Sequence, residues 1–327
     1  MISRIVHDSC NGASLLLNFL LIWLILTKTP SYLRCYSLVL LYLAIVQLTA
    51  AVSSLLIFKK IMSTPSYYIH SVCGPCRHWD MPSLCFRINV VHMAGMAHFD
   101  ALIAFCYCYR YYVISYSRVE PQIRNVIVSL ILLHLPTIAV YTNFAFSSLL
   151  VGLEQERAMN ETHPEYEKQQ GEMLIVIRRD FSVHLSAYWF QCIIFITCFI
   201  VAIASIRLNR ILASVEHMSA SSRRRHSQIL KSLLWQAILP SLYGLSAIAY
   251  KATMHRIKSG EEIGHIPLVM GSILTALSPI FNIIFTPPYR NALTRLIRKQ
   301  EEDNLPKKSD DSSTILMKPL PTGSSTA

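Results

Sequence analysis

Long apolar stretches separated by short polar segments recur along almost the whole chain. Seven of them are long enough to cross a bilayer core of about 30 Å as helices. They cover residues 9–27, 35–57, 84–109, 123–149, 183–206, 229–250 and 263–286. The strict alternation of apolar and polar residues that a membrane barrel requires is missing. The pattern therefore predicts an all-α membrane protein, a seven-transmembrane helix bundle.

The third stretch is the least apolar of the seven. Its polar side chains are Arg87, Asn89, His92, His98 and Asp100. An aspartate at the bilayer centre costs about 2.5–3.5 kcal/mol on insertion scales. We therefore expect Asp100 to face the bundle, where Ser, Tyr or His of a neighbouring helix bonds to it, or to be protonated.

Polar segments flank the membrane domain, which is expected to cover residues 9–286. Residues 1–8 should form an extracellular N-terminus. In residues 287–300 two prolines are followed by apolar residues at helical spacing among basic ones, which predicts a short amphipathic juxtamembrane helix. Residues 301–327 are polar and cannot bury a core, so we expect a disordered cytoplasmic tail.

Composition and charge support a membrane protein and indicate its orientation. The chain is 53% hydrophobic and 15% charged, which is too apolar for an ordinary soluble domain. If the N-terminus lies outside, the inner connections at 28–34, 110–124 and 207–231 hold eleven Lys and Arg against two Glu. This bias favours a multi-pass membrane protein with an extracellular N-terminus. The net charge of +11 then indicates attraction to anionic membrane lipid, and no nucleic acid is implied.

The longest outer connection, from about 150 to 182, carries the only N-glycosylation sequon of the chain. This is Asn-Glu-Thr at 160–162. Asn160 is therefore expected to carry a glycan on the extracellular side, which would make the protein a glycoprotein.

Five segments, in their order and spacing, resemble the nematode serpentine chemoreceptors, most closely the class delta group. The segments are "TKTPSYLRCYSLVLLYLAIVQL", "GPCRHW", "FCYCYRYYV", "RRRHSQILKSLLWQAILP" and "SPIFNIIFTPPYR". The resemblance covers about residues 5 to 299 and implies a rhodopsin-like GPCR architecture. It also implies a location in the plasma membrane, and a role in olfaction and signal transduction in the sensory cilia of chemosensory neurons. The implied partners are a small-molecule chemical ligand and a heterotrimeric G protein, with no cofactor.

The resemblance places Tyr109, Arg110 and Tyr111 where rhodopsin-like receptors carry an acidic-Arg-Tyr triplet that switches on G-protein coupling. Tyr109 replaces the acidic residue, so the ion pair within the triplet is absent. Arg110 would then be free to contact the G protein. The alternative is that Arg110 reaches the lipid headgroups as an anchor among interfacial tyrosines.

Other switch residues follow from the same resemblance. Trp235 and Pro240 resemble the aromatic and proline hinge of the sixth helix. Pro279 and Asn282 stand near the Asn-Pro and Tyr element of the seventh. The alternative for each proline is a packing kink without a switching role.

The ligand is expected to bind between the outer halves of the helices. His92 lies about two turns outward from Asp100 and is the main candidate for a polar contact. Met96, Tyr188 and Tyr243 are further ligand-binding candidates. A pocket with apolar walls and few polar groups suits many ligands, so the ligand cannot be named.

Four cysteines, Cys10, Cys73, Cys76 and Cys85, fall on or near the outer, oxidising side. Residues 141–191 contain no cysteine, so the usual staple of rhodopsin-like receptors to the second outer loop cannot form. The resemblance and the short separation favour a Cys76–Cys85 disulfide. The alternatives are that Cys85 pairs with Cys73 or Cys10, or that all four cysteines remain thiols.

Two other classes of protein remain open. An intramembrane metal hydrolase could use His92, His98, Asp100, His134 and His184 as zinc ligands. However, His98 and Asp100 face different sides of a helix, and no span carries a His-x-x-x-His pair, so no metal site is expected. A multi-span transporter would show paired, broken helices in two matching halves, which are not evident. Because no catalytic signature is present, we do not expect an enzyme.

Overall fold

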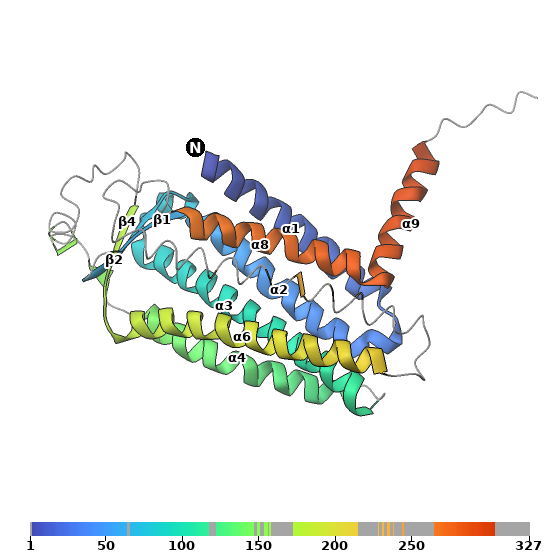
Figure 1. Cartoon of the computed structure of the whole chain (residues 1–327). Helices are drawn as coiled ribbons and strands as arrows, with labels where there is room; N and C mark the ends of the chain where they lie inside the picture. The colour runs from blue at the N-terminus through green and yellow to red at the C-terminus, as the bar shows by residue number, and fades with distance from the viewer. Residues whose placement is uncertain are drawn as a thin grey trace, which may run out of the picture.

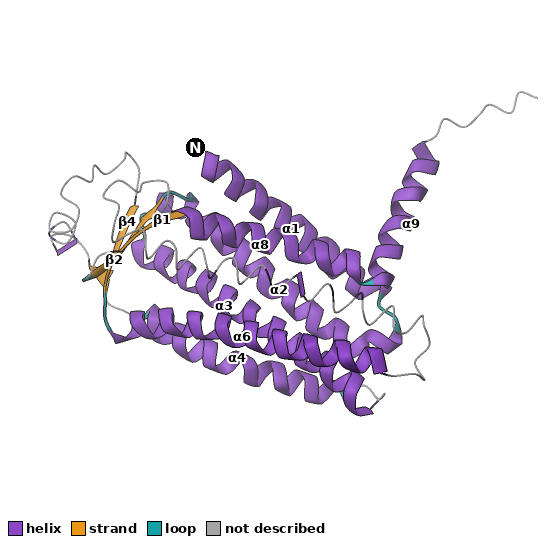
Figure 2. Cartoon of the chain, in the orientation of Figure 1, coloured by secondary structure: helices purple, strands orange, loops and turns teal. Residues whose placement is uncertain are grey.

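The computed structural model consists of long helices that run side by side, with a small sheet at one end (Figures 1 and 2). It describes residues 2–63, 66–117, 122–146, 149–150, 154–155, 157, 173–214, 228, 231, 234–235, 238, 244 and 265–304. Its main helices are α1 (Ile2–Lys28), α2 (Arg34–Ile57), α3 (Pro82–Tyr112), α4 (Ile123–Ala145), α6 (Phe181–Ser214), α8 (Ile266–Phe285) and α9 (Pro287–Asn304).

Six of these helices are long and apolar enough to cross a membrane. They are α1, α2, α3, α4, α6 and α8, and each overlaps most of one predicted span. Of the remaining predicted span, 229–250, the structure describes only Lys231, Leu234, Trp235, Ile238 and Gly244, and all five are helical.

Helix α3 is the central helix of the bundle. It packs against α2, α4 and α6, whereas α1 packs against α2 and α8. In its most apolar stretch 67% of the residues are buried, compared with 17% for α4. This position explains why the least apolar span is tolerated, because four of its polar side chains, those of Asn89, His92, His98 and Asp100, are buried in protein rather than facing lipid. Arg87, near the start of α3, is exposed.

A four-stranded antiparallel sheet, in the order β1-β2-β4-β3, covers one end of the bundle. Its strands are β1 (Lys59–Ser63), β2 (Tyr67–Val72), β3 (Leu149–Leu150) and β4 (Met173–Arg178). The helical bundle agrees with the predicted fold class, but the sequence analysis did not predict this sheet. The sequence "MLIVIR" of β4 is a short run rich in β-branched residues, which is a strand signal. This six-residue run is much shorter than the membrane spans, and the sequence analysis did not identify it as a strand.

The ends of several helices differ from the predicted ones. Helix α1 begins at Ile2 instead of residue 9, because His7 and Asn11 bond to Ser54 of α2 and hold the first turns in place. Helix α4 ends at Ala145, and Leu149 and Leu150, the last of which lies beyond the predicted span, belong to β3. Helix α9 begins at Pro287, where the juxtamembrane helix was expected, and continues to Asn304, four residues beyond the expected end. Residues 305–327 lie outside the described part.

The bundle thus has two distinct ends, which we call the sheet end and the α9 end (Figure 1). Residues 58–63 and 66–81 and strands β3 and β4 lie at the sheet end, together with the start of α1. Residues 29–33 and 113–117, which belong to connections predicted to be cytoplasmic, lie at the opposite end, near α9.

Candidate functional site

A buried polar cluster lies where the sheet meets the helices. Lys59 is the first residue of β1, just beyond the end of α2, and its side chain is only 3% exposed. Its Nζ donates a hydrogen bond to Oδ1 of Asn89 on α3. The Asn89 Nδ2 group donates in turn to Nδ1 of His70 on β2, at 3.4 Å. The cluster therefore links the sheet to α3.

The sheet register places both basic side chains over the bundle. Lys59 pairs with Val72, and Ile61 pairs with His70. Because side chains alternate along a strand and paired residues share a face, Lys59 and His70 point to the same side of the sheet. That side is the one that carries Val72 onto the apolar core.

The electrostatics of this cluster are unusual because it contains the buried amine of Lys59 without a carboxylate beside it. No acidic side chain of the described residues forms a salt bridge with Lys59. Burial lowers the pKa of Lys59 to about 7. Burial lowers the pKa of His70 well below its usual range, and the nearby charge of Lys59 lowers it further. His70 is therefore neutral at physiological pH.

Aromatic contacts connect this cluster to α1 and α8. The Phe58 ring lies 4.9 Å from the rings of both His7 and His265, measured between centroids. His265 Nδ1 donates to the backbone carbonyl of Lys59 at 3.1 Å. The chain around Lys59 is thus held by three helices and the sheet.

His92, the main ligand candidate, lies one turn further into the bundle than Asn89. It is buried, and its Nδ1 donates to the backbone carbonyl of Ala50 on α2 at 3.1 Å. Close packing allows this bond, since a Cβ on Gly95 would lie 3.2 Å from the Ala50 Cβ. Met96 is also buried and belongs to the apolar core.

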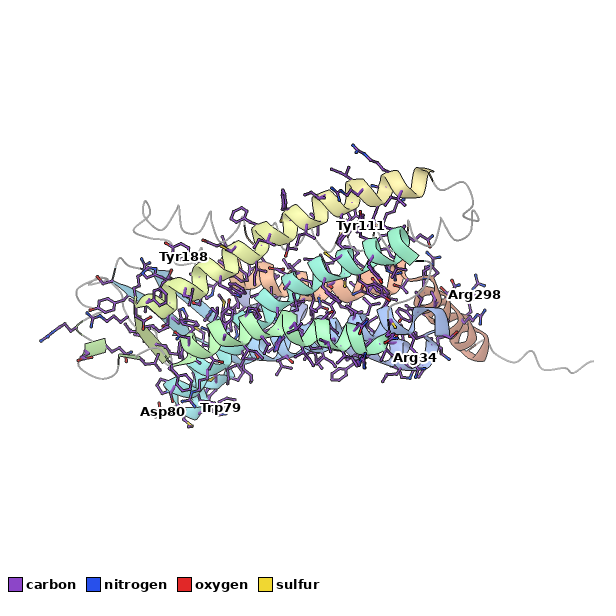
Figure 3. The ribbon with its side chains drawn as sticks, turned by 90° about the horizontal axis from the view of Figure 1, so that it is seen from below. Arg34, Trp79, Asp80, Tyr111, Tyr188 and Arg298 are labelled. Carbon is purple, nitrogen blue, oxygen red and sulfur yellow. A yellow bond between two sulfur atoms is a disulfide. The ribbon has the colours of Figure 1, made fainter. Side chains whose placement is uncertain are left out.

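Tyr188 does not lie with these two residues. It is 62% exposed on α6, where its ring stacks on His184 at 6.3 Å. Figure 3 shows it toward the same end as Trp79 and Asp80. Tyr243 and the sequon residue Asn160 lie outside the described residues. The four candidates are therefore not seen as one pocket in the part of the chain that the structure describes.

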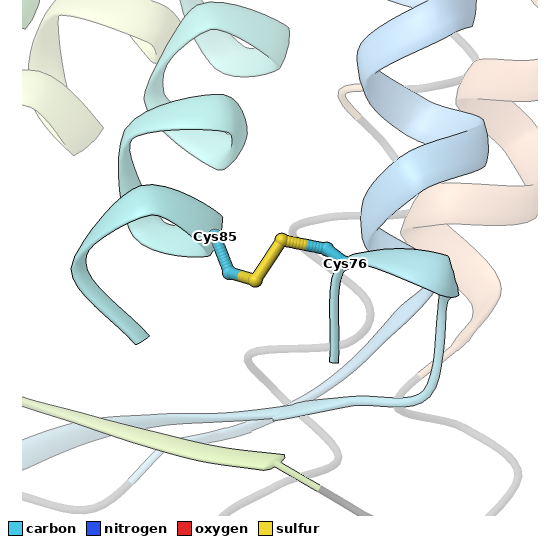
Figure 4. Close-up of a disulfide and its surroundings, with 2 residues drawn as sticks. All are labelled: Cys76 and Cys85. Carbon is cyan, nitrogen blue, oxygen red and sulfur yellow. A yellow bond between two sulfur atoms is a disulfide. The ribbon is translucent and has the colours of Figure 1, made fainter. Parts of the chain in front are cut away.

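A disulfide fixes the start of α3 at the sheet end (Figure 4). It joins Cys76 and Cys85, whose Cα atoms are 5.8 Å apart, and this is the pairing that the resemblance favoured. Gly74 lets the short helix at Pro75–Trp79 approach α2, because a Cβ there would lie 2.4 Å from the Leu56 carbonyl oxygen.

The proposed zinc ligands do not gather at one place. The rings of His98 and His134 are 4.2 Å apart, but His92 bonds to Ala50 and His184 stacks on Tyr188. Within the described residues no three His, Cys, Asp or Glu side chains are arranged to hold a metal ion. The geometry therefore gives no support to a metal hydrolase.

Asp100 faces the bundle as expected, but the expected partner for its carboxyl group is not found. Its Oδ1 is buried without a hydrogen-bond partner among the described residues. The contact to a neighbouring helix comes instead from its backbone carbonyl, which accepts a bond from Thr197 on α6 at 3.0 Å.

Arg110 lies inside the bundle at the α9 end. It is 3% exposed, and its guanidinium carbon lies 3.6 Å from the centroid of the Tyr36 ring on α2. Nε and Nη2 have no hydrogen-bond partner within the described part of the chain. Arg110 therefore does not extend to lipid as the anchor interpretation expected, and it packs against the ring of Tyr36. Its role in G-protein coupling stays a prediction.

The remaining switch candidates are spread over several helices. Tyr109 is buried and stacks on Tyr36 at 6.0 Å, whereas Tyr111 is partly buried near the α9 end (Figure 3). Pro279 and Asn282 are buried in α8. Trp235 is half exposed and stacks on Phe281 of α8 at 6.0 Å. Pro240 lies outside the described residues.

Comparison with known proteins identifies the family. Residues 3–295 match the family described as "Serpentine type 7TM GPCR chemoreceptor Srd". The chain belongs to this family. It is a multi-pass membrane protein with the seven-helix architecture of such receptors.

Individual relatives agree with this assignment. Serpentine receptor class delta-3 of Caenorhabditis elegans is 27% identical over 304 residues, which cover 89% of this chain and 86% of the relative. Serpentine receptor class delta-1 of the same organism is 27% identical over 297 residues, covering 88% and 79%. The crystal structure of squid rhodopsin superposes with a TM-score of 0.57 at 13% identity, covering 91% of this chain and 85% of the rhodopsin. At that identity the likeness shows the fold alone.

Three residues of these sites escaped the sequence analysis. Lys59 follows the apolar stretch at 35–57 and His70 lies between two such stretches, and neither was singled out. Tyr36 was one tyrosine among many in an apolar helix. Their proximity to Asn89 and Arg110 depends on how the sheet and α2 pack against α3, and no local pattern signals this packing.

Proposed function

We propose that this protein is a G-protein-coupled chemosensory receptor of the plasma membrane. It binds a small external molecule at the sheet end and activates a heterotrimeric G protein at the α9 end. The N-terminus and the sheet are extracellular, as the positive charge of the opposite connections favours. Family membership supports placement in the sensory cilia of chemosensory neurons.

The observation that carries this proposal is the burial of Arg110 against Tyr36 at the α9 end of the central helix. A buried guanidinium with unused donors is costly unless another contact compensates. The Tyr36 ring supplies such a contact in this packing. If α2 and α3 separate at this end, Arg110 becomes available to acceptor groups of a bound G protein.

Ligand binding drives this change only if the ligand prefers the packing in which Arg110 is released. Helix α3 runs between the two ends, and the Cys76–Cys85 disulfide fixes its start. The polar cluster at Asn89 joins the same helix to the sheet. A ligand that alters these contacts therefore acts on the helix that carries Arg110.

The test is a cell assay in which chemical extracts are screened for activation of a labelled heterotrimeric G protein. Arg110→Ala should abolish the ligand-evoked signal at normal surface expression, because the contact with the G protein is lost. Arg34→Ala is the matched control, since Arg34 is exposed at the same end of the bundle. Unchanged signalling by Arg110→Ala would contradict the proposed role of this residue.

A further inference from the structure

The cluster of Lys59, Asn89 and His70 has more N–H donors than hydrogen-bond acceptors, and none of its acceptors is negatively charged. An ammonium group has three N–H donors and no acceptor. Within the described part of the chain, the Lys59 side chain donates its hydrogen bond to Oδ1 of Asn89, a neutral amide oxygen. No described carboxylate forms a salt bridge with it.

The hydrogen-bond directions also determine the state of His70. Because the Lys59 ammonium can only donate, Asn89 must present its oxygen to Lys59 and its NH₂ group to His70. Nδ1 of His70 therefore accepts, and the neutral ring carries its proton on Nε2. His70 thus supplies a second donor on the same face of the sheet as Lys59.

We infer that Lys59 and His70, positioned by Asn89, form the binding site for the carboxylate group of a small organic acid, the external ligand. This inference rests on the proposed receptor function and names the chemical class of its ligand. The Lys59 ammonium donates to the carboxylate in place of its bond to Asn89, and Nε2–H of His70 donates to the second oxygen. The acid thus provides the counter-charge that the buried cation lacks.

The site is connected to the switch through one pair of helices. Lys59 directly follows α2, and Asn89 lies on α3, so an acid that draws Lys59 away from Asn89 removes a contact between these two elements. At the other end the same two helices are joined by Tyr36 and Arg110. Burial of Lys59 also means that the sheet must move to admit the acid, which couples binding to packing.

The test measures binding to the purified full-length receptor in phosphatidylcholine nanodiscs, without a G protein. Butanoate, hexanoate and octanoate are titrated beside the alcohols of equal chain length. At one or more lengths the acid should bind at least about tenfold more tightly than the alcohol, as expected for a charge-assisted bond. Lys59→Met should remove this preference. Lys60→Met is the control, because Lys60 is a buried neighbour that points to the opposite face of the strand.

A second measurement uses the unaltered protein and so does not depend on how a variant folds. Octanoate affinity should be constant below pH 7 and fall by about tenfold per pH unit above it, as Lys59 loses its proton. The other titratable groups around the amine are His7, His70, His92 and His265, and Lys60 lies beside it. Lys60→Met should leave the pH profile in place.

Several results would overturn the site. They are equal affinity for acid and alcohol at every chain length, an acid preference retained by Lys59→Met, or constant octanoate affinity from pH 6 to 9. Failure of this proposal is distinguishable from failure of the receptor function. A receptor that signals to extracts but shows no acid preference lacks only this site, whereas acid binding without any G-protein activation would count against the coupling.

Discussion

The guanidinium carbon of Arg110 lies 3.6 Å from the centroid of the Tyr36 ring, so an arginine of the central helix is stacked on a tyrosine of its neighbour. The ring is itself buried and stacks on Tyr109. In rhodopsin-like receptors an ion pair within the acidic-Arg-Tyr triplet restrains this arginine. Here Tyr109 replaces the acidic residue, and the arginine packs against a tyrosine ring instead. A desolvated cation–π contact is worth about 2 kcal/mol or more.

The first prediction concerns basal signalling. Tyr36→Leu removes the ring that holds Arg110, so G-protein activation without ligand should rise, by up to about 30-fold if the full 2 kcal/mol is lost. Tyr36→Phe keeps the ring and should stay near the unaltered receptor. The measurement is basal activation of a labelled G protein at matched surface expression. Equal basal signals from Tyr36→Leu and the unaltered receptor would show that the stacking does not restrain the inactive packing.

The second prediction concerns stability and pH. The pKa of Lys59 is about 7 in the folded protein, compared with 10.5 for the ordinary side chain. Between these values the unfolded chain binds more protons, so the Lys59 contribution to stability rises with pH. The stability difference between the unaltered receptor and Lys59→Met should change by about 2 kcal/mol from pH 7 to 9, in favour of the unaltered receptor.

This stability measurement is a thermal melt of each protein without added acid. Burial lowers the pKa values of His70 and His265, so both rings stay neutral between pH 7 and 9. They therefore do not contribute to the difference between the two proteins over this range. Parallel pH profiles of the two proteins would mean that Lys59 titrates normally in the folded state.

The third prediction concerns the disulfide. Peptide mapping without reduction should recover a fragment that links Cys76 to Cys85. Cys85→Ser should lower the free energy of unfolding by about 3 kcal/mol, the value that chain entropy assigns to a loop of this size. Because Cys85→Ser alone already breaks the disulfide, adding Cys76→Ser should lower the free energy of unfolding by little more. Cys73→Ser is the control, since Cys73 is not part of this disulfide. Labelling of Cys76 and Cys85 by a thiol reagent in unreduced cells would refute the pairing.

The fourth prediction concerns topology. In animal cells the protein should shift on a gel after glycosidase treatment, and Asn160→Gln should abolish that shift. A tag inserted near Gln169 should be stained on intact cells. Staining only after permeabilisation, together with no glycosidase shift, would place this connection in the cytoplasm and reverse the proposed orientation.

The sequence by itself determined the membrane class and the number of spans, since a bilayer requires long apolar helices whatever their neighbours. Six of the predicted spans are found as helices at nearly the predicted places. The juxtamembrane helix could also be predicted from the sequence, because two prolines end the last span and apolar residues then recur at helical spacing. These features depend on local composition and period.

Tertiary structure alone decided which polar groups meet. Arg110 is next to Tyr109 in sequence, yet it is restrained by Tyr36 from another helix. Lys59 follows an apolar stretch and would be solvated there, but β1 pairs with β2, which in turn pairs with β4, and Lys59 is buried in contact with Asn89. Strand pairing and helix packing join residues distant in sequence, and the free energy of burying a charge depends on those distant neighbours. A local pattern therefore located the helices but could not reveal the contacts between them.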